Sequence, residues 1–395
     1  MKILLTSYVY PPTACGCSES ASVLARGLAK RGHDVTVFTT HHPDRPPVTV
    51  DAGVRVESFK ISGNHNWKVG IQGSPEEIAR YRKMLSEFSA DLIIFENWDI
   101  WSTLLAERLV GRLKPKKIIV SHGYTPHLWH PHPGLGWGLG NWLGGWPLLL
   151  RTPFLMRYYD RLVVLSKRPT LGRFFDHWLA RATGFNKVTA IPNGAFAGEF
   201  NREDMPDFRR EYGIGPGLMI LYVANFCDRK DQMKAMRVFR QARLKDATLV
   251  LIGSEFNEYI EGVRRADAAL QTQFPEGRVV YLEKVGRPKT CAAYRTADLF
   301  MLTAWAETQP IVLMEAMASH TPWLATDVGC VAELPGGVVV RQEAELVAKL
   351  QELAGSPALR QKLSDEGWAA CQATYDWDQV VNAYERLVKE IVGHA

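Results

Sequence analysis

Two glutamates in the second half of the chain bracket a short apolar run. The stretch 306–320 reads AETQPIVLMEAMASH and places Glu307 and Glu315 eight positions apart, with Pro310 between them. Inside a helix a proline costs about 3 kcal/mol, whereas at the first helical position it is favoured. We therefore expect Pro310 to open a helix, with Glu307 in the loop before it and Glu315 on the turn after it.

This arrangement suits an anion that carries neighbouring hydroxyl groups. The N–H groups of Ile311, Val312 and Leu313 would lie in the first helical turn, where they have no partner within the helix and can bind a phosphate. A carboxylate on each side would then accept hydrogen bonds from hydroxyl groups. The spacing alone is also that of an ordinary solvated pair, so the surrounding sequence has to distinguish the two interpretations.

Apolar runs separated by helical patterns predict the elements that position these residues. The runs lie at 2–8, 34–40, 91–97, 116–122 and 161–166 in the first half, and at 218–226, 248–253, 278–285, 298–304 and 321–329 in the second. Strands that are apolar on both faces and alternate with helices are typical of covered parallel sheets. The predicted fold class is therefore α/β, with two doubly wound domains.

The domain limits are predicted from helix-capping and turn-forming residues. Residues 18–33 start with Ser18 and Glu19 in capping positions and continue with helical periodicity, which predicts a strand-helix-strand unit. The triplet 192–194 reads Pro-Asn-Gly and marks a break. We expect a first domain at 1–190, a second at 191–374, and an amphipathic helix at 375–395 that packs back on the first domain.

The overall composition is that of a globular protein. There are 47 Lys+Arg and 42 Asp+Glu, for a net charge of +5, and this mild excess does not indicate a nucleic-acid partner. The six cysteines have no paired spacing, which predicts reduced thiols in a cytoplasmic protein. No run of about 18 apolar residues occurs, and a proline pair ends the first apolar run early, so we expect neither a membrane span nor a signal peptide.

The segment 130–151 differs from the rest because it is crowded with glycine and tryptophan. We expect it to be irregular, and three interpretations stay open: an acceptor-binding loop, an interfacial patch on a membrane surface, and irregular core packing. A basic stretch follows, either as a solvated face or as an attraction for an anionic surface. Its cations are Arg151, Arg157, Arg161, Lys167, Arg168, Arg173, Arg181 and Lys187.

Two motifs imitate metal sites. The histidines His127, His130 and His132 lie among prolines, without a carboxylate or cysteine at ligand spacing. The Asp-Trp-Asp triplet 376–378 falls on the expected C-terminal helix. We therefore expect no metal site, and the absence of a GxGxxG after the first strand argues against a nicotinamide dehydrogenase.

The residues around the two glutamates resemble the retaining glycosyltransferases of family GT4, which have the GT-B fold. The matching motifs here are the two glutamates with seven residues between them, EAMA at 315–318 and ATDVG at 325–329. The resemblance covers nearly the whole chain. It includes the prolines and glycine of 11–16, LARGLAKRGHDVTVFT at 24–39, SH at 121–122, DRLVVLS at 160–166, IPNG at 191–194 and DRK at 228–230.

The resemblance implies two Rossmann-like domains facing a cleft, with the acceptor bound by the first and a nucleoside-diphosphate sugar by the second. It further implies that the anomeric configuration is retained, that no metal is required, and that there is no cofactor beyond the sugar nucleotide as co-substrate. The implied catalytic residues are His122 and Glu307. The implied donor-binding residues are Gly16, Arg229, Lys230, Val285, Gly286, Ile311, Val312 and Glu315.

Each implied role has a chemical reason. Glu315 would hold the ribose hydroxyls, and Glu307 and His122 would contact the transferred sugar. Lys230, with Arg229, would neutralise the leaving diphosphate. Gly16 would let the backbone approach the phosphate closely, because it has no Cβ. The loop at 285–286 would meet the base.

The chain also departs from the family pattern. Cys17 follows Gly16 where the family has a second glycine, Asn225-Phe226 replaces Gly-Arg, and Thr308-Gln309-Pro310 replaces Gly-Phe-Gly. A common glycine is His320 here. These changes leave the nucleotide and the sugar open.

The acceptor is open as well. The product would be a glycolipid, a polysaccharide or another glycoconjugate, and one interpretation has a lipid-linked or amphiphilic acceptor with peripheral contact at the cytoplasmic face of a membrane. The alternative functions are another GT-B chemistry, a phosphorylase or nucleotide-sugar epimerase, and a catalytically silent sugar-nucleotide-binding module.

Overall fold

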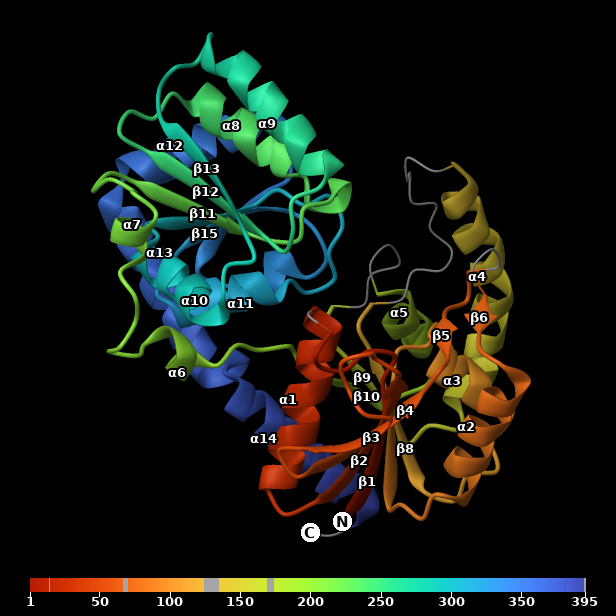
Figure 1. The fold of residues 1–395 in the computed structure, drawn as a ribbon. Helices are drawn as coiled ribbons and strands as arrows, with labels where there is room; N and C mark the ends of the chain where they lie inside the picture. Colours follow the sequence, from red (N-terminus) through yellow and green to blue (C-terminus); the bar gives the residue numbers. More distant parts are fainter. Residues whose placement is uncertain (14, 67–69, 124–134, 169–173, 394–395) are drawn as a thin grey trace. The chain divides into compact units, whose positions relative to one another are not determined.

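The computed structural model describes residues 1–13, 15–66, 70–123, 135–168 and 174–393 (Figure 1). The chain divides into one unit of Met1–Pro192 with Val380–Ala395 and a second unit of Asn193–Gln379. The division therefore lies two residues beyond the break expected from the sequence, and the end of the chain from Val380 belongs to the first unit.

The first unit contains an eight-stranded sheet in the order β10-β9-β8-β7-β1-β2-β4-β3, parallel except for the edge strand β3. The order reverses at β1, so the carboxyl ends of β1 and β7 flank a switch point, where doubly wound sheets bind ligands. The strands are β1 (Lys2–Thr6), β2 (Asp34–Thr40), β3 (Val48–Asp51), β4 (Val54–Phe59), β7 (Leu92–Glu96), β8 (Lys116–Ser121), β9 (Arg161–Val164) and β10 (Val188–Ala190). A separate pair is formed by β5 (Ser62–Gly63) and β6 (Ile71–Gln72).

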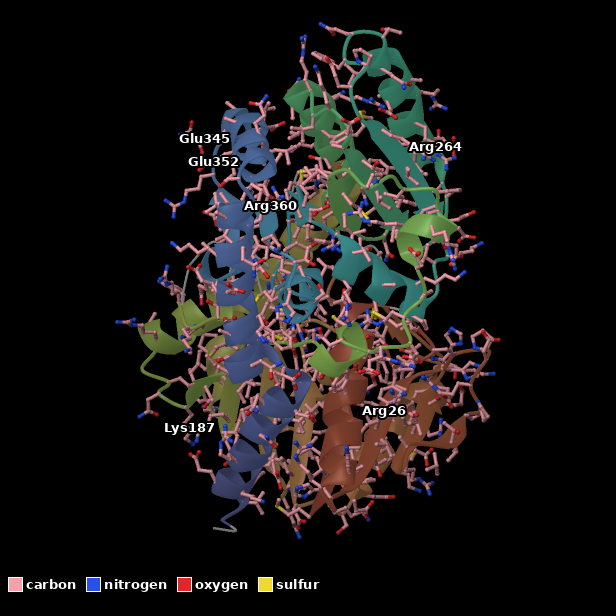
Figure 2. The ribbon with its side chains drawn as sticks, turned by 90° about the vertical axis from the view of Figure 1, so that its left-hand side faces the viewer. Arg26, Lys187, Arg264, Glu345, Glu352 and Arg360 are labelled. Atoms are coloured by element: carbon pink, nitrogen blue, oxygen red, sulfur yellow. The ribbon has the colours of Figure 1, made fainter. Side chains whose placement is uncertain are left out.

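Helices cover both faces of this sheet (Figure 1). On one face lie α1 (Gly16–Lys30) and α14 (Trp377–Val392), which approach so closely that a Cβ on Gly27 would lie 2.7 Å from Val381. On the other face lie α2 (Pro75–Glu87), α3 (Trp101–Ala106), α4 (Leu135–Met156) and α5 (Phe175–Ala182). At the exposed side of α1, Arg26 pairs with Asp51 at 2.8 Å (Figure 2).

The start of α1 differs from the prediction. The helix begins at Gly16, two residues before Ser18, with Cys15 as an N-cap that makes no side-chain capping bond. Ser18 and Glu19 therefore lie inside the first turn, and the expected capping role is wrong. Among the described residues, the N-cap side chain of α1 therefore leaves the first backbone N–H groups of the helix uncapped.

The expected irregular structure of 130–151 is also wrong where the structure describes it. From Leu135 the chain is the helix α4, which continues through Pro147 and Pro153. Leu148, Thr152 and Met156 lie on successive turns and are all buried. Burial of this stripe stabilises the helix despite the low helix propensity of glycine and proline. The part of the segment at 130–134 lies outside the described residues.

The second unit contains a six-stranded, fully parallel sheet in the order β13-β12-β11-β14-β15-β16. Its switch point lies between β11 and β14. The strands are β11 (Met219–Val223), β12 (Thr248–Gly253), β13 (Arg278–Glu283), β14 (Leu299–Leu302), β15 (Trp323–Thr326) and β16 (Gly337–Val340). Together the two sheets confirm the predicted α/β class with two doubly wound units.

Helices again cover both faces of the second sheet (Figure 1). One face carries α8 (Gln232–Ala242), α9 (Glu258–Gln271) and α12 (Leu346–Gly355), and the other α10 (Arg287–Thr296), α11 (Ile311–Ala318) and α13 (Pro357–Ala370). Short helices α6 (Ala197–Phe200) and α7 (Phe208–Glu211) follow the break after residue 192. A π-helical turn at Cys371–Tyr375 precedes α14, which starts two residues later than expected. Among the described helices, none combines the length and the apolar character needed to cross a membrane.

Candidate functional site

The switch point of the second sheet brings together two residues that are 77 positions apart. Lys230 ends the short 3-10 turn Asp228–Lys230 after β11, and Glu307 lies in the loop after β14. Lys230 Nζ donates a hydrogen bond to Glu307 Oε1 in an ion pair. The two side chains are 15% and 9% exposed, so the pair is largely shielded from solvent.

Hydrogen bonds between the two loops keep this pair in place. Thr303 Oγ1 donates to the backbone carbonyl of Asp231 at 2.8 Å, and Trp305 Nε1 donates to that of Asp228 at 3.0 Å. Asp231 has a φ of 52° and caps α8 through Lys234 N–H. The loop after β14 is therefore tied to the loop after β11 along its length.

A third loop packs against the backbone at Glu307 and Thr308, and the sequence did not identify this contact. Gly329 has a φ of 53°, and a Cβ there would lie 2.0 Å from the carbonyl oxygen of Thr308. The next residue, Cys330, donates its N–H to that same oxygen at 2.8 Å. Only glycine fits this approach, and the available signal was the glycine that ends ATDVG.

In the triplet Thr308-Gln309-Pro310, which departs from the family pattern, the central residue Gln309 has a structural role. Gln309 is 7% exposed, and its Oε1 accepts a hydrogen bond from Asn193 N–H at 2.5 Å. Asn193 is the first residue of the second unit. Gln309 thus ties the loop of Glu307 to the point where the chain enters this unit.

Pro310 directly precedes the helix, whereas the prediction made it the first helical residue. It is the N-cap of α11, with φ −71° and ψ 110°, and Ile311 is the first helical residue. Leu313 N–H bonds to the carbonyl of Pro310 at 3.0 Å, so the expectation of a free N–H there is wrong. Among the described residues, the N–H groups of Ile311 and Val312 have no acceptor, and they remain available to an anion.

Glu315 lies on α11 and is almost fully buried, with 8% of its side chain exposed. It forms an ion pair with Arg287 Nη1 at the start of α10, and Arg287 also contacts Glu199 through Nε and Nη2 at 3.0 and 2.8 Å. Burial is the largest single influence and lowers the pKa of Arg287, but the charge and hydrogen bond of Glu315, together with the nearby Cys291 and Glu199, raise that pKa overall. The sequence did not identify Arg287, because nothing in its local pattern marks a partner 28 residues away.

The other expected donor residues of this unit lie at loop positions. Val285 packs against the core after β13, and Gly286 is the N-cap of α10, with open space where a Cβ would be. The side chain of Arg229 is exposed and makes no ion pair within the described part of the chain. The structure thus brings Lys230 and Glu307 into contact and leaves Arg229 separate.

In the first unit, His122 follows β8 at the carboxyl edge of the sheet. Its backbone N–H donates to Asn97 Oδ1 at 2.9 Å, and its Nε2 lies 3.6 Å from Glu96 Oε2. Ser7, after β1, donates its hydroxyl to the same carboxylate oxygen at 3.4 Å. His122 therefore lies beside the switch point of the first sheet.

Gly16 opens α1 at this same switch point, after β1. Cys17, which stands where the family has a second glycine, has a buried thiol whose pKa is raised to about 12, mainly by burial. Such a thiol is not a nucleophile at neutral pH.

The motifs set aside as metal sites keep other roles or lie elsewhere. Asp376 accepts hydrogen bonds from Ala197 N–H at 3.1 Å and from Asp378 N–H at 2.8 Å, so it caps α14 and holds the chain after the break. Its triplet is structural. Within the described ranges, no group of three His, Cys, Asp or Glu side chains is close enough to hold a metal ion. The residues His127, His130 and His132 lie outside those ranges.

Comparisons with known proteins identify the family of both halves of the chain. A glycosyl transferase 4-like domain model matches residues 16–194, and a glycosyl transferases group 1 model matches 217–356. An uncharacterized glycosyltransferase of Methanocaldococcus jannaschii is 25% identical over 345 residues, covering 85% of this chain and 82% of the relative.

Solved structures have the same architecture. Sucrose-phosphate synthase from Thermosynechococcus elongatus superposes with a TM-score of 0.78 at 19% identity, covering all of both chains. The Anabaena protein HepE, solved in complex with UDP, superposes with a TM-score of 0.72 at 14% identity, covering 99% of this chain and 100% of that one.

Proposed function

The chain belongs to the group 1 glycosyl transferases of family GT4 and has the GT-B fold, and on that premise we propose how it works. It transfers a sugar from a nucleoside diphosphate to an acceptor hydroxyl, with retention of the anomeric configuration and without a metal ion. The second unit binds the donor and the first binds the acceptor.

The observation that carries this proposal is the shielded Lys230–Glu307 pair at the second switch point. A departing diphosphate needs fixed positive charge, and Lys230 supplies it together with the free N–H groups of Ile311 and Val312. Glu307, on the adjoining loop, accepts hydrogen bonds from the hydroxyl groups of the sugar. Glu315, one turn into α11, binds the ribose hydroxyls after exchanging its contact with Arg287.

The proposed chemistry is a displacement on one face of the sugar. The bond between the anomeric carbon and the phosphate oxygen breaks, and the acceptor oxygen bonds to the same carbon from the same side. The proton of the acceptor hydroxyl passes to the departing phosphate oxygen. His122 contacts the sugar near the reacting carbon. A glycosyl adduct trapped on any carboxylate of the chain would contradict this scheme.

The nucleotide is tested by a thermal-shift screen of nucleoside diphosphates and their sugars in the presence of EDTA. A ligand at one hundred times its dissociation constant stabilises the folded protein by about 2.7 kcal/mol. We expect at least one nucleoside diphosphate to raise the melting temperature, and UDP is the first probe because the HepE structure contains it. A flat response to every compound would contradict the proposal.

Two variants separate the proposed roles of the glutamates. Glu307→Ala is expected to abolish transfer without weakening nucleotide binding, whereas Glu315→Ala is expected to lose nucleotide binding. The matched control is Glu345→Ala, an exposed glutamate of the same unit (Figure 2). Equal and undiminished activity of both site variants would refute the assignment.

The rival functions predict different products. A phosphorylase or an epimerase would return a sugar phosphate or an altered nucleotide sugar, and a silent binding module would return the donor unchanged. Chromatography of the products from a radiolabelled donor distinguishes these outcomes from a glycosylated acceptor.

An apolar ridge on α4 supports an amphiphilic or lipid-linked acceptor, with peripheral contact at the cytoplasmic face of a membrane. Leu143, Trp146, Leu150 and Phe154 are 44%, 41%, 65% and 65% exposed, and their spacing places them on one side of the helix. Trp178 of α5, which packs against α4, is 38% exposed. Exposed cations of the basic stretch include Arg157, Arg181 and Lys187, the last of which is labelled in Figure 2. Such cations favour anionic headgroups.

Vesicle sedimentation tests this contact. At low salt we expect the protein to pellet with vesicles that contain phosphatidylglycerol, and Leu150→Ser with Phe154→Ser to release it. Val50→Ser is the matched control, because Val50 is 72% exposed but lies on the edge strand β3. No binding to anionic vesicles at low salt would remove the membrane proposal and leave a soluble acceptor.

A further inference from the structure

A buried carboxylate at the end of β7 has no role in the scheme above. Glu96 is 1% exposed, and its Oε1 has no hydrogen-bond partner among the described residues. Its Oε2 accepts from Ser7 Oγ at 3.4 Å and faces His122 Nε2 at 3.6 Å. Within the described part of the chain, His122 is the one basic side chain within ion-pair distance of Glu96.

The groups packed around Glu96 from other elements are neutral. The Cys17 thiol of α1 and the Tyr384 hydroxyl of α14 are buried, and the pKa of each is raised, first by burial and further by the charge of Glu96. A thiol and a phenol therefore stay protonated here. A buried carboxylate in such surroundings is costly unless it accepts a charged or strongly polar donor.

His122 is positioned to be that donor. Its backbone N–H donates to Asn97 Oδ1, and among the described residues its buried Nε2 has no hydrogen-bond partner. The ring nitrogen that faces a carboxylate carries the proton, and the other nitrogen is then an acceptor. Among the described residues, Nδ1 of His122 has no hydrogen-bond partner, so it is open to a ligand.

We propose that Glu96 is a positioning residue that holds His122 in the Nε2–H tautomer and presents the Nδ1 lone pair to a hydroxyl group of the transferred sugar. This inference rests on the proposed function, because it gives His122 one orientation and one hydrogen-bonding role there. Glu96 acts through His122 and does not touch the sugar.

The tautomer is measured directly in the full-length wild-type protein without any substrate. Protein labelled with 15N-histidine is examined by long-range 1H–15N correlation near pH 8, and His122→Asn assigns the signal. We expect the neutral ring of His122 to carry its proton on Nε2. A proton on Nδ1, or rapid averaging between the two tautomers, would overturn the proposal.

A variant pair tests whether Glu96 is the cause. Glu96→Leu replaces the carboxylate with an apolar side chain of similar size and is expected to give mixed His122 tautomers. It is also expected to lower kcat on the order of tenfold or more, with the donor KM changed by less than about twofold. Glu57→Leu is the matched control, since Glu57 is 4% exposed in the same sheet but pairs with Arg55 and Arg80. It should leave the tautomer unchanged.

The outcomes separate the two proposals. An unchanged tautomer and kcat in Glu96→Leu would overturn the positioning role. Failure of the wild-type protein to transfer any sugar would refute the proposed function, yet the tautomer would still be read without substrate. If Glu96→Leu does not fold, Glu96→Asp replaces it, and its shorter side chain should give a smaller shift toward mixed tautomers.

Discussion

The contact between Lys230 and Glu307 makes a prediction that distinguishes nucleotide binding from sugar transfer. In the free protein Lys230 Nζ is paired with Glu307, so a diphosphate has to compete for the ammonium group and approach the carboxylate. Glu307→Gln removes that competing charge without removing the side chain. We therefore expect this variant to bind nucleoside diphosphates more tightly and to transfer sugar more slowly.

The magnitude follows from the geometry. Two unit charges about 6 Å apart interact by about 3 kcal/mol at an effective dielectric constant of 20. A hydrogen bond to a charged group contributes about 1.5–3 kcal/mol. Residual solvent contact reduces both values, so we expect Glu307→Gln to tighten binding of the diphosphate by about 2 kcal/mol, or about thirtyfold. Lys230→Met should weaken it by a similar factor.

Isothermal titration calorimetry with UDP, or with the nucleotide found in the thermal screen, measures both effects. Glu345→Gln, an exposed glutamate of the same unit, is the control and should bind like the wild type. In the double variant, the gain from Glu307→Gln should shrink, because Lys230 is no longer there to be released. Weaker binding by Glu307→Gln than by the wild type would refute the reasoning, as would full transfer activity in Lys230→Met.

Three further substitutions have defined outcomes. Gly329→Ala should reduce transfer strongly and destabilise the second unit by about 2–4 kcal/mol, since its Cβ overlaps the carbonyl oxygen of Thr308 at a positive φ; activity and chemical unfolding check this, and a wild-type profile would contradict it. Asp176→Asn should remove a pH dependence of the free energy of unfolding. Burial raises the pKa of Asp176 to about 6 from 3.8, so the folded state binds the proton more tightly than the unfolded state does. The wild type therefore loses about 3 kcal/mol of stability as pH rises from about 4 to 6. The free energy of unfolding of the variant minus that of the wild type should be larger at pH 7 than at pH 4 by about that amount. Asp376→Ala should lower stability by about 1–2 kcal/mol through the lost bonds to Ala197 and α14, with transfer in EDTA unchanged at saturating donor; loss of transfer without loss of stability would point to a functional role instead.

The strands that the sequence predicted share one physical property. Runs such as 248–253 are apolar on both faces because helices cover both sides of the sheet, and β12 has these same limits. The missed strands lack that signal. β3 is a half-exposed edge strand, β4 alternates in polarity at its start, and β16 begins at a glycine that fits against Trp323.

The misassigned segment shows how tertiary packing outweighs local preference. Glycine and proline in α4 disfavour a helix, and the burial of Leu148, Thr152 and Met156 offsets that preference. That burial depends on elements far away in the sequence, which a local pattern does not contain.

The candidate site was partly predictable for the same kind of reason. The preference of proline for helix starts predicted that Glu307 lies in a loop and Glu315 on a helix. In the structure Pro310 is the N-cap of that helix, one position before the predicted one. The pairs Glu315 with Arg287 and His122 with Glu96 join residues 28 and 26 positions apart. Glu96 and His122 meet because β7 and β8 are neighbours in the sheet, and Arg287 and Glu315 meet because α10 and α11 pack together. No local spacing indicates either pair.

The most direct test of the central claim is the configuration of the product. The full chain is incubated in EDTA with a nucleoside-diphosphate sugar that binds in the thermal screen and with candidate acceptors. The anomeric proton of the new glycosidic bond is then observed by NMR. We predict that the product forms and has the same anomeric configuration as the donor. An inverted product, or no glycosidic product with a donor that binds, would contradict the account.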